Sequence, residues 1–130
     1  MAVKQKEVVR TSAEFRSPTV SLLLWWGIFA GPVGVALDEM LSYAIVQHSC
    51  STGHHGLLHF YTAVAILLSI SGFAAALWCY RRLPPTNLEG GSTAARSRWM
   101  AIYGMAASSV FILVMIAMSI PKWAMSPCDQ

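Results

Sequence analysis

The sequence predicts an all-α integral membrane protein in which three transmembrane helices form a small bundle. Apolar side chains make up 55% of the 130 residues, whereas only 12% are charged. Soluble domains carry roughly 25% charged residues, so this composition is typical of a chain surrounded by lipid. Three segments also have the length and apolar character of a spanning helix, which needs about 20 residues.

The expected spans cover residues 18–47, 57–80 and 99–120. Ser17 and Pro18 are typical of a helix start, with serine as the N-cap and proline at the first helical position. Pro121 is expected to end the third span. The apolar run that follows the polar first 17 residues is too long for a signal peptide, so we expect the first span to remain as an anchor.

The basic residues predict the direction of the chain across the membrane. The tail over residues 1–17 and the loop over residues 81–98 hold eight of the nine, namely Lys4, Lys6, Arg10, Arg16, Arg81, Arg82, Arg96 and Arg98. The short loop over residues 48–56 and the C-terminal end hold only Lys122. Because lysine and arginine collect on the cytoplasmic side, we expect the N-terminus inside and the C-terminus outside. This placement explains the net charge of +3 without a nucleic-acid partner, and the 81–98 loop is expected to be a connector.

Small residues predict how the helices associate, because close backbone contact drives helix packing in lipid. They form one face on each expected span, made of Gly27, Gly31 and Gly34, then Ser69, Gly72 and Ala76, then Gly104 and Ser108. Pro32 lacks a backbone donor and is expected to kink the first span. Two interpretations stay open: the faces pack within one compact bundle, or they dock onto helices of another protein.

Two carboxylates lie inside the first span. Asp38 and Glu39 are costly in lipid, by roughly 2.5–3.5 kcal/mol for an aspartate at a helix centre. Glu39, Tyr43 and Gln47 form one stripe at helical spacing, and Ser42 lies beside it. Three roles fit: a carboxyl group that is neutral or hydrogen-bonded to Tyr or Ser within the bundle, a contact with a partner subunit, or a proton-transfer group.

Histidines and cysteines gather near the expected outer side. The histidines are His48, His54, His55 and His59. A spacing of four, as between the last two, can place two imidazoles on one metal. Haem or copper is therefore an alternative to histidines that hydrogen-bond water or headgroups, although no complete ligand set is present. Cys50 and Cys128 follow spans that end on the same side, so we predict a disulfide between them. Cys79 is expected to be a plain small apolar residue.

One stretch of the first span resembles a family. Gly31-Pro32-Val33, Leu37-Asp38-Glu39, the run from Leu41 to Val46, Cys50 and a late Pro127-Cys128 are similar to motifs of small uncharacterised bacterial membrane proteins with three spans. Those proteins are often encoded beside haem–copper cytochrome oxidase subunits. The resemblance implies a place in the bacterial inner membrane and an association with respiratory electron transfer. The chain departs from the family pattern in His54 and His55, which puts a shared metal role in doubt.

Three functions are compatible with these features. The leading hypothesis is a non-catalytic accessory subunit of a larger membrane complex, in contact with lipids and with other subunits such as those of cytochrome oxidase. The second is a small redox protein that binds haem or a metal through its outer histidines. The third is an assembly factor that leaves the mature complex. No nucleophile triad, phosphate loop or dinucleotide motif is present in the sequence.

Overall fold

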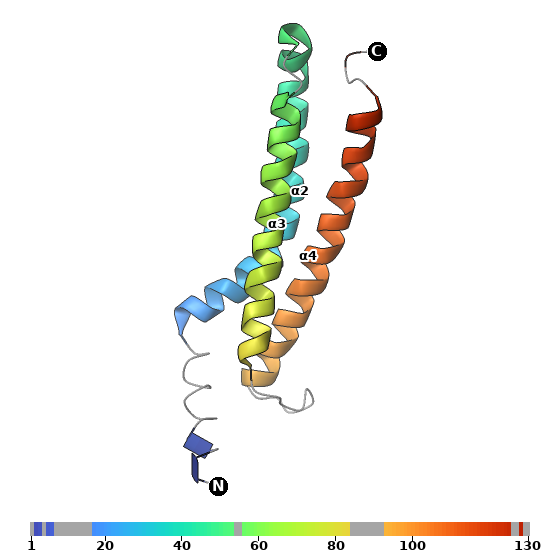
Figure 1. Cartoon of the computed structure of the whole chain (residues 1–130). Helices are drawn as coiled ribbons and strands as arrows, with labels where there is room; N and C mark the ends of the chain where they lie inside the picture. Colours follow the sequence, from blue (N-terminus) through green and yellow to red (C-terminus); the bar gives the residue numbers. More distant parts are fainter. Residues whose placement is uncertain are drawn as a thin grey trace.

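The computed structural model describes residues 2–3, 5–6, 17–53, 56–83, 93–125 and 128. Within them, three long helices form an all-helical bundle (Figure 1). The helices are α2 (Pro18–Thr52), α3 (Gly56–Arg82) and α4 (Thr93–Ala124). Each is long and apolar enough to cross a membrane. The prediction of three candidate transmembrane helices in an all-α bundle is therefore confirmed.

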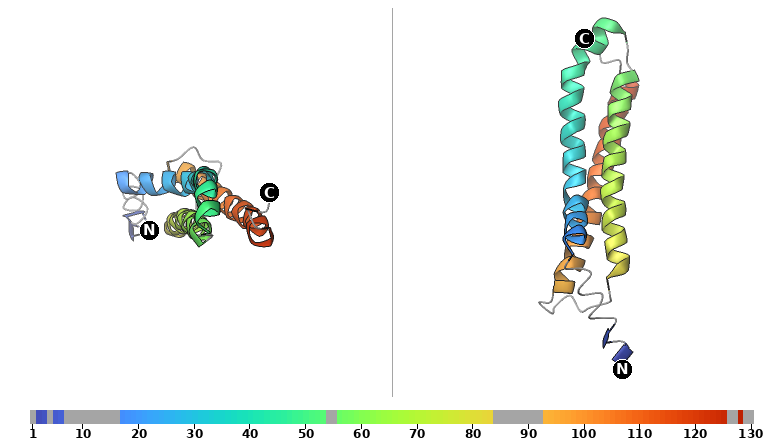
Figure 2. Two further views of the ribbon diagram at one scale, coloured as in Figure 1. Left: turned by 90° about the horizontal axis from the view of Figure 1, so that it is seen from above. Right: turned by 90° about the vertical axis from the view of Figure 1, so that its left-hand side faces the viewer.

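Each helix of the bundle contacts the other two. Consecutive helices are antiparallel, so α2 and α4 run in the same direction and α3 runs in the opposite direction (Figures 1 and 2). One end of the bundle carries Arg81, Arg82, Arg96 and Arg98, and we call it the arginine end. The opposite end carries Cys50 and Cys128, and we call it the disulfide end.

Helix α2 is bent. Figure 1 shows its first part, in blue, leaning away from the rest of the helix, and the view from above in Figure 2 shows the same displacement. Pro32 lies inside this helix. Its ring nitrogen cannot donate to the carbonyl of Ile28, and its ring crowds that carbonyl, so the helix bends there.

The helix ends differ in part from the expected span limits. Helix α2 ends where Gly53 adopts a left-handed conformation with φ 72°, and the Gly53 N–H donates to the Ser49 carbonyl at 2.9 Å. Ser17 stands at the N-cap position, but its side chain makes no capping hydrogen bond. Pro121 does not end α4, which continues to Ala124. A proline near the end of a helix removes one hydrogen bond and leaves few later turns to disturb.

The interior of the bundle is made of small side chains and the surface of large apolar ones. Among the described residues, the largest fully buried side chains are Met115, Cys79, Ser49, Ser69 and Ser108. Large apolar side chains are exposed on all three helices, for example Leu22, Phe29, Met40, Phe60, Leu67, Leu113 and Ile120. Helices pack this way when lipid, rather than water, covers their outer surface. The structure thus has the features of a multi-pass membrane protein.

Candidate functional site

All three helices contact one another through glycines in the half of the bundle nearer the arginine end. A Cβ placed on Gly27 of α2 would lie 3.0 Å from the Cβ of Ala76 in α3. A Cβ on Gly104 of α4 would lie 3.2 Å from the Gly27 carbonyl carbon. The Ser108 hydroxyl donates to the Gly27 carbonyl oxygen at 3.0 Å. The absence of side chains at these glycines therefore lets all three backbones approach one another.

The contact between α2 and α3 continues toward the disulfide end. A Cβ on Gly72 would lie 2.5 Å from the Cβ of Ala30, and one on Gly34 would lie 2.6 Å from the Ser69 Oγ. Gly31 faces α4 instead, where a Cβ would lie 3.0 Å from the ring of Phe111. The predicted glycine faces thus contact neighbouring helices of the same chain. These glycines are consequently not available to a foreign helix.

Beyond the glycines lies a cluster of polar side chains contributed by all three helices. Asp38 of α2 is 2% exposed, and its Oδ2 accepts from the Lys122 Nζ of α4 at 2.9 Å. Its Oδ1 accepts from the Thr62 hydroxyl of α3 at 2.7 Å. Both oxygens of this buried carboxylate are therefore satisfied within the chain, one by a counter-charge and one by a neutral donor. We call Asp38, Ser42, Thr62 and Lys122 the Asp38 cluster.

The ammonium group of Lys122 is also fully used. Besides Asp38, it donates to the Ser42 Oγ at 3.1 Å and to the Thr62 Oγ1 at 3.4 Å. An ammonium group has three N–H donors, and these three acceptors account for them. With 25% of its side chain exposed, Lys122 keeps some contact with the surroundings. The cluster is an ion pair that joins the three helices, and its lysine has no free donor with which to bind a ligand.

The level of the cluster in the bundle follows from helix geometry. At 1.5 Å per residue, Thr62 lies about 9 Å along α3 from its first residue, and Asp38 lies about 21 Å from the last residue of α2. Since these two side chains are hydrogen-bonded, the end of α2 projects beyond the start of α3, as the right-hand view of Figure 2 shows. The ion pair thus lies in the half of the bundle nearer the disulfide end.

Glu39 differs from its neighbour Asp38. Its side chain is half-buried, and no described residue forms a hydrogen bond or ion pair with its carboxylate. Tyr43, one turn further along α2, is 77% exposed. The two carboxylates predicted as one polar site therefore separate into an internal group that is paired and a lateral group that is not.

A small cavity lies beside the Asp38 cluster. It has a volume of about 60 Å³, and its lining comes from α2 and α3: Leu37, Asp38, Leu41, Tyr61, Val64, Ala65 and Leu68. Pockets for cofactors measure about 300–1,000 Å³. This space can hold a few water molecules but not a haem.

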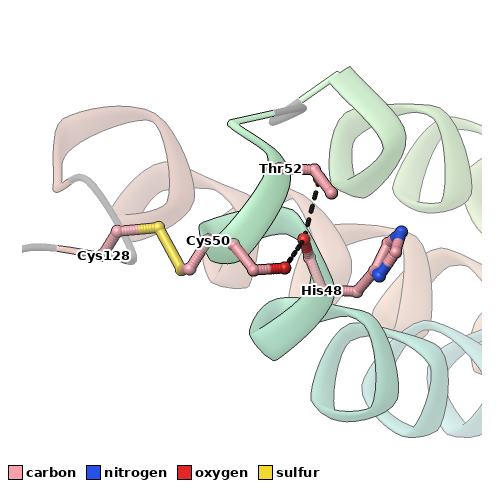
Figure 3. The surroundings of a disulfide bond; sticks show 5 residues. His48, Cys50, Thr52 and Cys128 are labelled. Carbon is pink, nitrogen blue, oxygen red and sulfur yellow. Dashed lines mark hydrogen bonds between the residues drawn. A yellow bond between two sulfur atoms is a disulfide. The ribbon is translucent and has the colours of Figure 1, made fainter.

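The histidines are not gathered into one site by the described part of the chain. His59 packs against the ring of Trp123, with the ring centroids 4.6 Å apart. The imidazole of His48 points away from the disulfide in Figure 3. His54 and His55 lie outside the described residues. Across the described ranges, no three His, Cys, Asp or Glu side chains form a group that could hold a metal ion.

The predicted disulfide is present at the end of the bundle. Cys50 and Cys128 are bonded, with their Cα atoms 5.6 Å apart, and Figure 3 shows the bond joining the last turn of α2 to the segment after α4. That turn is reinforced by Ser51 and Thr52, whose hydroxyls donate to the His48 carbonyl at 2.9 and 2.8 Å. Cys79 is a buried free cysteine in α3.

Aromatic and basic side chains interact at the arginine end. The Arg98 guanidinium donates to the Tyr80 hydroxyl at 3.1 Å and lies 5.0 Å from the centre of its ring. Arg82 lies 4.4 Å from the ring centre of Trp78. Trp26 donates through its indole N–H to the Ser71 hydroxyl at 3.2 Å. Aromatic rings beside basic residues are typical of the boundary between lipid and water.

No protein-family model, curated protein or solved structure matches this chain. The geometry alone therefore indicates what the site can do. The sequence indicated Asp38 and Ser42 but not Thr62 or Lys122, which complete the cluster. The sequence does hold a clue to Lys122 as the partner of Asp38. It is the one lysine or arginine close to the end of the bundle at which Asp38 lies.

Proposed function

We propose that this protein is a non-catalytic accessory subunit of a larger complex in the bacterial inner membrane. In this proposal the arginine end faces the cytoplasm and the disulfide end faces the oxidising outer side, because lysine and arginine collect on the cytoplasmic side. The aromatic residues beside Arg82 and Arg98 support a place for the arginine end at a membrane–water interface. The respiratory nature of the complex rests on the sequence resemblance described above.

Glu39 is the observation that carries the proposal. Carboxylates within spans nearly always face protein or water and pair with another group. Asp38 has its counter-charge within the chain, whereas no described residue pairs with Glu39. Both side chains are at the same level of α2, one residue apart. A helix of another subunit, carrying a lysine, an arginine or a hydrogen-bond donor, would supply the missing partner.

The docking surface is therefore the flank of α2 that carries Glu39, rather than a glycine face. The glycines are occupied by contacts within the bundle. On this flank the exposed neighbours Met40 and Tyr43 would add apolar contact area. A partner that pairs with Glu39 would thus bind beside the bundle without opening it.

Affinity purification from native membranes tests the proposal. We expect the tagged full chain, extracted in a mild detergent, to retain integral membrane partners that mass spectrometry can identify. Glu39→Gln removes the charge and should lose these partners while the variant still elutes as a folded bundle. Leu67→Ala, a change at an exposed apolar position of α3 away from this flank, is the control and should retain them.

Two outcomes would contradict the proposal. The first is a wild-type chain that purifies alone, and the second is a Glu39→Gln variant that keeps its partners in full. Recovery of partners that are not respiratory would retain the subunit role and reject the respiratory assignment.

A further inference from the structure

The last turn of α4 is a weak point of the bundle. Pro121 has no backbone N–H, so the hydrogen bond to the Ala117 carbonyl that a helix would otherwise make is missing. The terminal turn of a helix also opens more readily than its middle. In the described structure, three contacts hold this segment to the rest of the bundle. They are the ion pair of Lys122 with Asp38, the ring contact of Trp123 with His59, and the disulfide between Cys128 and Cys50.

The disulfide is the contact that a reagent dissolved in water can reach. Cys50 and Cys128 are both exposed, and Cys50 lies in the part of α2 that projects beyond the start of α3 (Figures 2 and 3). A water-soluble dithiol can therefore attack this bond without entering the bundle. Cys79, in contrast, is buried in α3 and takes no part in the exchange.

We propose that the Cys50–Cys128 disulfide is a redox-controlled latch that keeps Lys122 on Asp38, and that its reduction frees this carboxylate. The reductant is a dithiol, which forms a disulfide of its own as the Cys50–Cys128 bond breaks. Two electrons and two protons pass from the dithiol to the two sulfur atoms, which become thiols. This inference does not depend on the accessory-subunit proposal.

Release of the latch changes the surroundings of both charges. The Lys122 side chain is already one-quarter exposed, so its ammonium group can turn toward the polar interface once the last turn of α4 is free. Asp38 cannot follow, because it lies 2% exposed among three helices. A carboxyl group that loses its counter-charge in apolar surroundings takes up a proton. The reduced protein therefore has an unpaired Asp38 carboxyl group where the oxidised protein has an ion pair.

Labelling with dicyclohexylcarbodiimide tests the latch, because this apolar reagent reacts with protonated carboxyl groups inside membranes. The full chain is placed in lipid nanodiscs and carries Glu39→Gln, so that the neighbouring carboxylate does not react. One half is kept oxidised, and the other is reduced with dithiothreitol and its thiols are alkylated. We expect Asp38 to be labelled several-fold faster in the reduced sample.

Two variants make the result specific. Lys122→Met removes the counter-charge and should give fast labelling in both redox states. Cys128→Ser should resemble the reduced protein without any reductant. Equal labelling of the oxidised and reduced samples, or a Cys128→Ser variant labelled as slowly as the oxidised protein, would overturn the proposal.

Hydrogen exchange gives a second readout that does not depend on a variant. Reduction should speed amide exchange over residues 119–125 several-fold and leave the middle of α3 unchanged. Unchanged exchange in the last turn of α4 would show that the disulfide does not hold it, and it would also reject the latch. Loss of protection throughout α3 would reject it as well, because the disulfide would then stabilise the bundle as a whole.

Discussion

Lys122 reaches Asp38 at 2.9 Å across 84 positions of sequence. The contact is possible because α2 and α4 run in the same direction with a nearly constant offset. Ser108 bonds to the Gly27 carbonyl with a separation of 81 positions, and Lys122 bonds to Ser42 with a separation of 80. The glycine contact near one end of the bundle therefore sets the register that places the lysine on the aspartate near the other end.

Removal of the counter-charge should destabilise the bundle. Lys122→Met leaves Asp38 buried without its partner, and breaking a fully buried pair costs about 3–5 kcal/mol. We expect a smaller loss here, because the lysine side chain is partly exposed. Denaturant titration in detergent micelles measures the free energy of unfolding. Asp38→Asn combined with Lys122→Met should recover part of the loss, and strictly additive losses would show that the two charges do not interact.

The hydrogen bond from Thr62 to the other oxygen of the Asp38 carboxylate should make its own contribution to stability. Thr62→Val keeps the shape of the side chain and removes the hydroxyl that donates to Asp38 at 2.7 Å. Hydrogen bonds to charged groups contribute about 1.5–3 kcal/mol, so a loss of that size is expected in the same unfolding measurement. Thr19→Val, at an exposed position near the start of α2, should change little and controls for the helix propensity of valine.

Glycine contacts should be intolerant of a methyl group. Gly72→Ala would place a Cβ 2.5 Å from that of Ala30, whereas nothing lies within 4 Å of the corresponding position at Gly56. Overpacking typically costs about 1–3 kcal/mol, and both substitutions gain helix propensity. We expect a lower thermal midpoint for Gly72→Ala and little change for Gly56→Ala. A Gly72→Ala variant as stable as the wild type would mean that the α2–α3 contact is looser than described.

The disulfide makes a simple prediction about thiols. Protein denatured without reductant should bind one equivalent of maleimide, on Cys79, because Cys50 and Cys128 are bonded. After reduction all three cysteines of the sequence should react. Mass spectrometry counts the added groups. Three reactive thiols in the sample denatured without reductant would contradict the bond.

The proposed direction of the chain can be checked with C-terminal fusions. Alkaline phosphatase attached after Gln130 should be active in bacterial cells, because the enzyme folds only on the outer side. Green fluorescent protein at the same position should be dark. The opposite pattern would place the arginine end outside and would remove the electrostatic basis of the proposed orientation.

The sequence predicts the helices and the disulfide but not the complete Asp38 cluster. The helices are predicted from long apolar runs, and the disulfide is predicted because Cys50 and Cys128 follow spans that end on the same side. The sequence places Lys122 just outside the third span, because Pro121 is expected to end that span. The structure continues α4 past that proline, and the register between α2 and α4 then decides which side chain meets Asp38. Such a register depends on backbone contacts between distant glycines, which a single sequence does not specify.

The ion pair also has a consequence for biosynthesis. Asp38 enters the membrane early during translation, whereas its counter-charge is made 84 residues later. Until α4 is inserted, the first two helices carry a costly carboxylate with only Thr62 to satisfy it. A chain cut short before Lys122 would thus keep a carboxylate without its counter-charge inside the bundle, and we expect it to be less stable than the full chain.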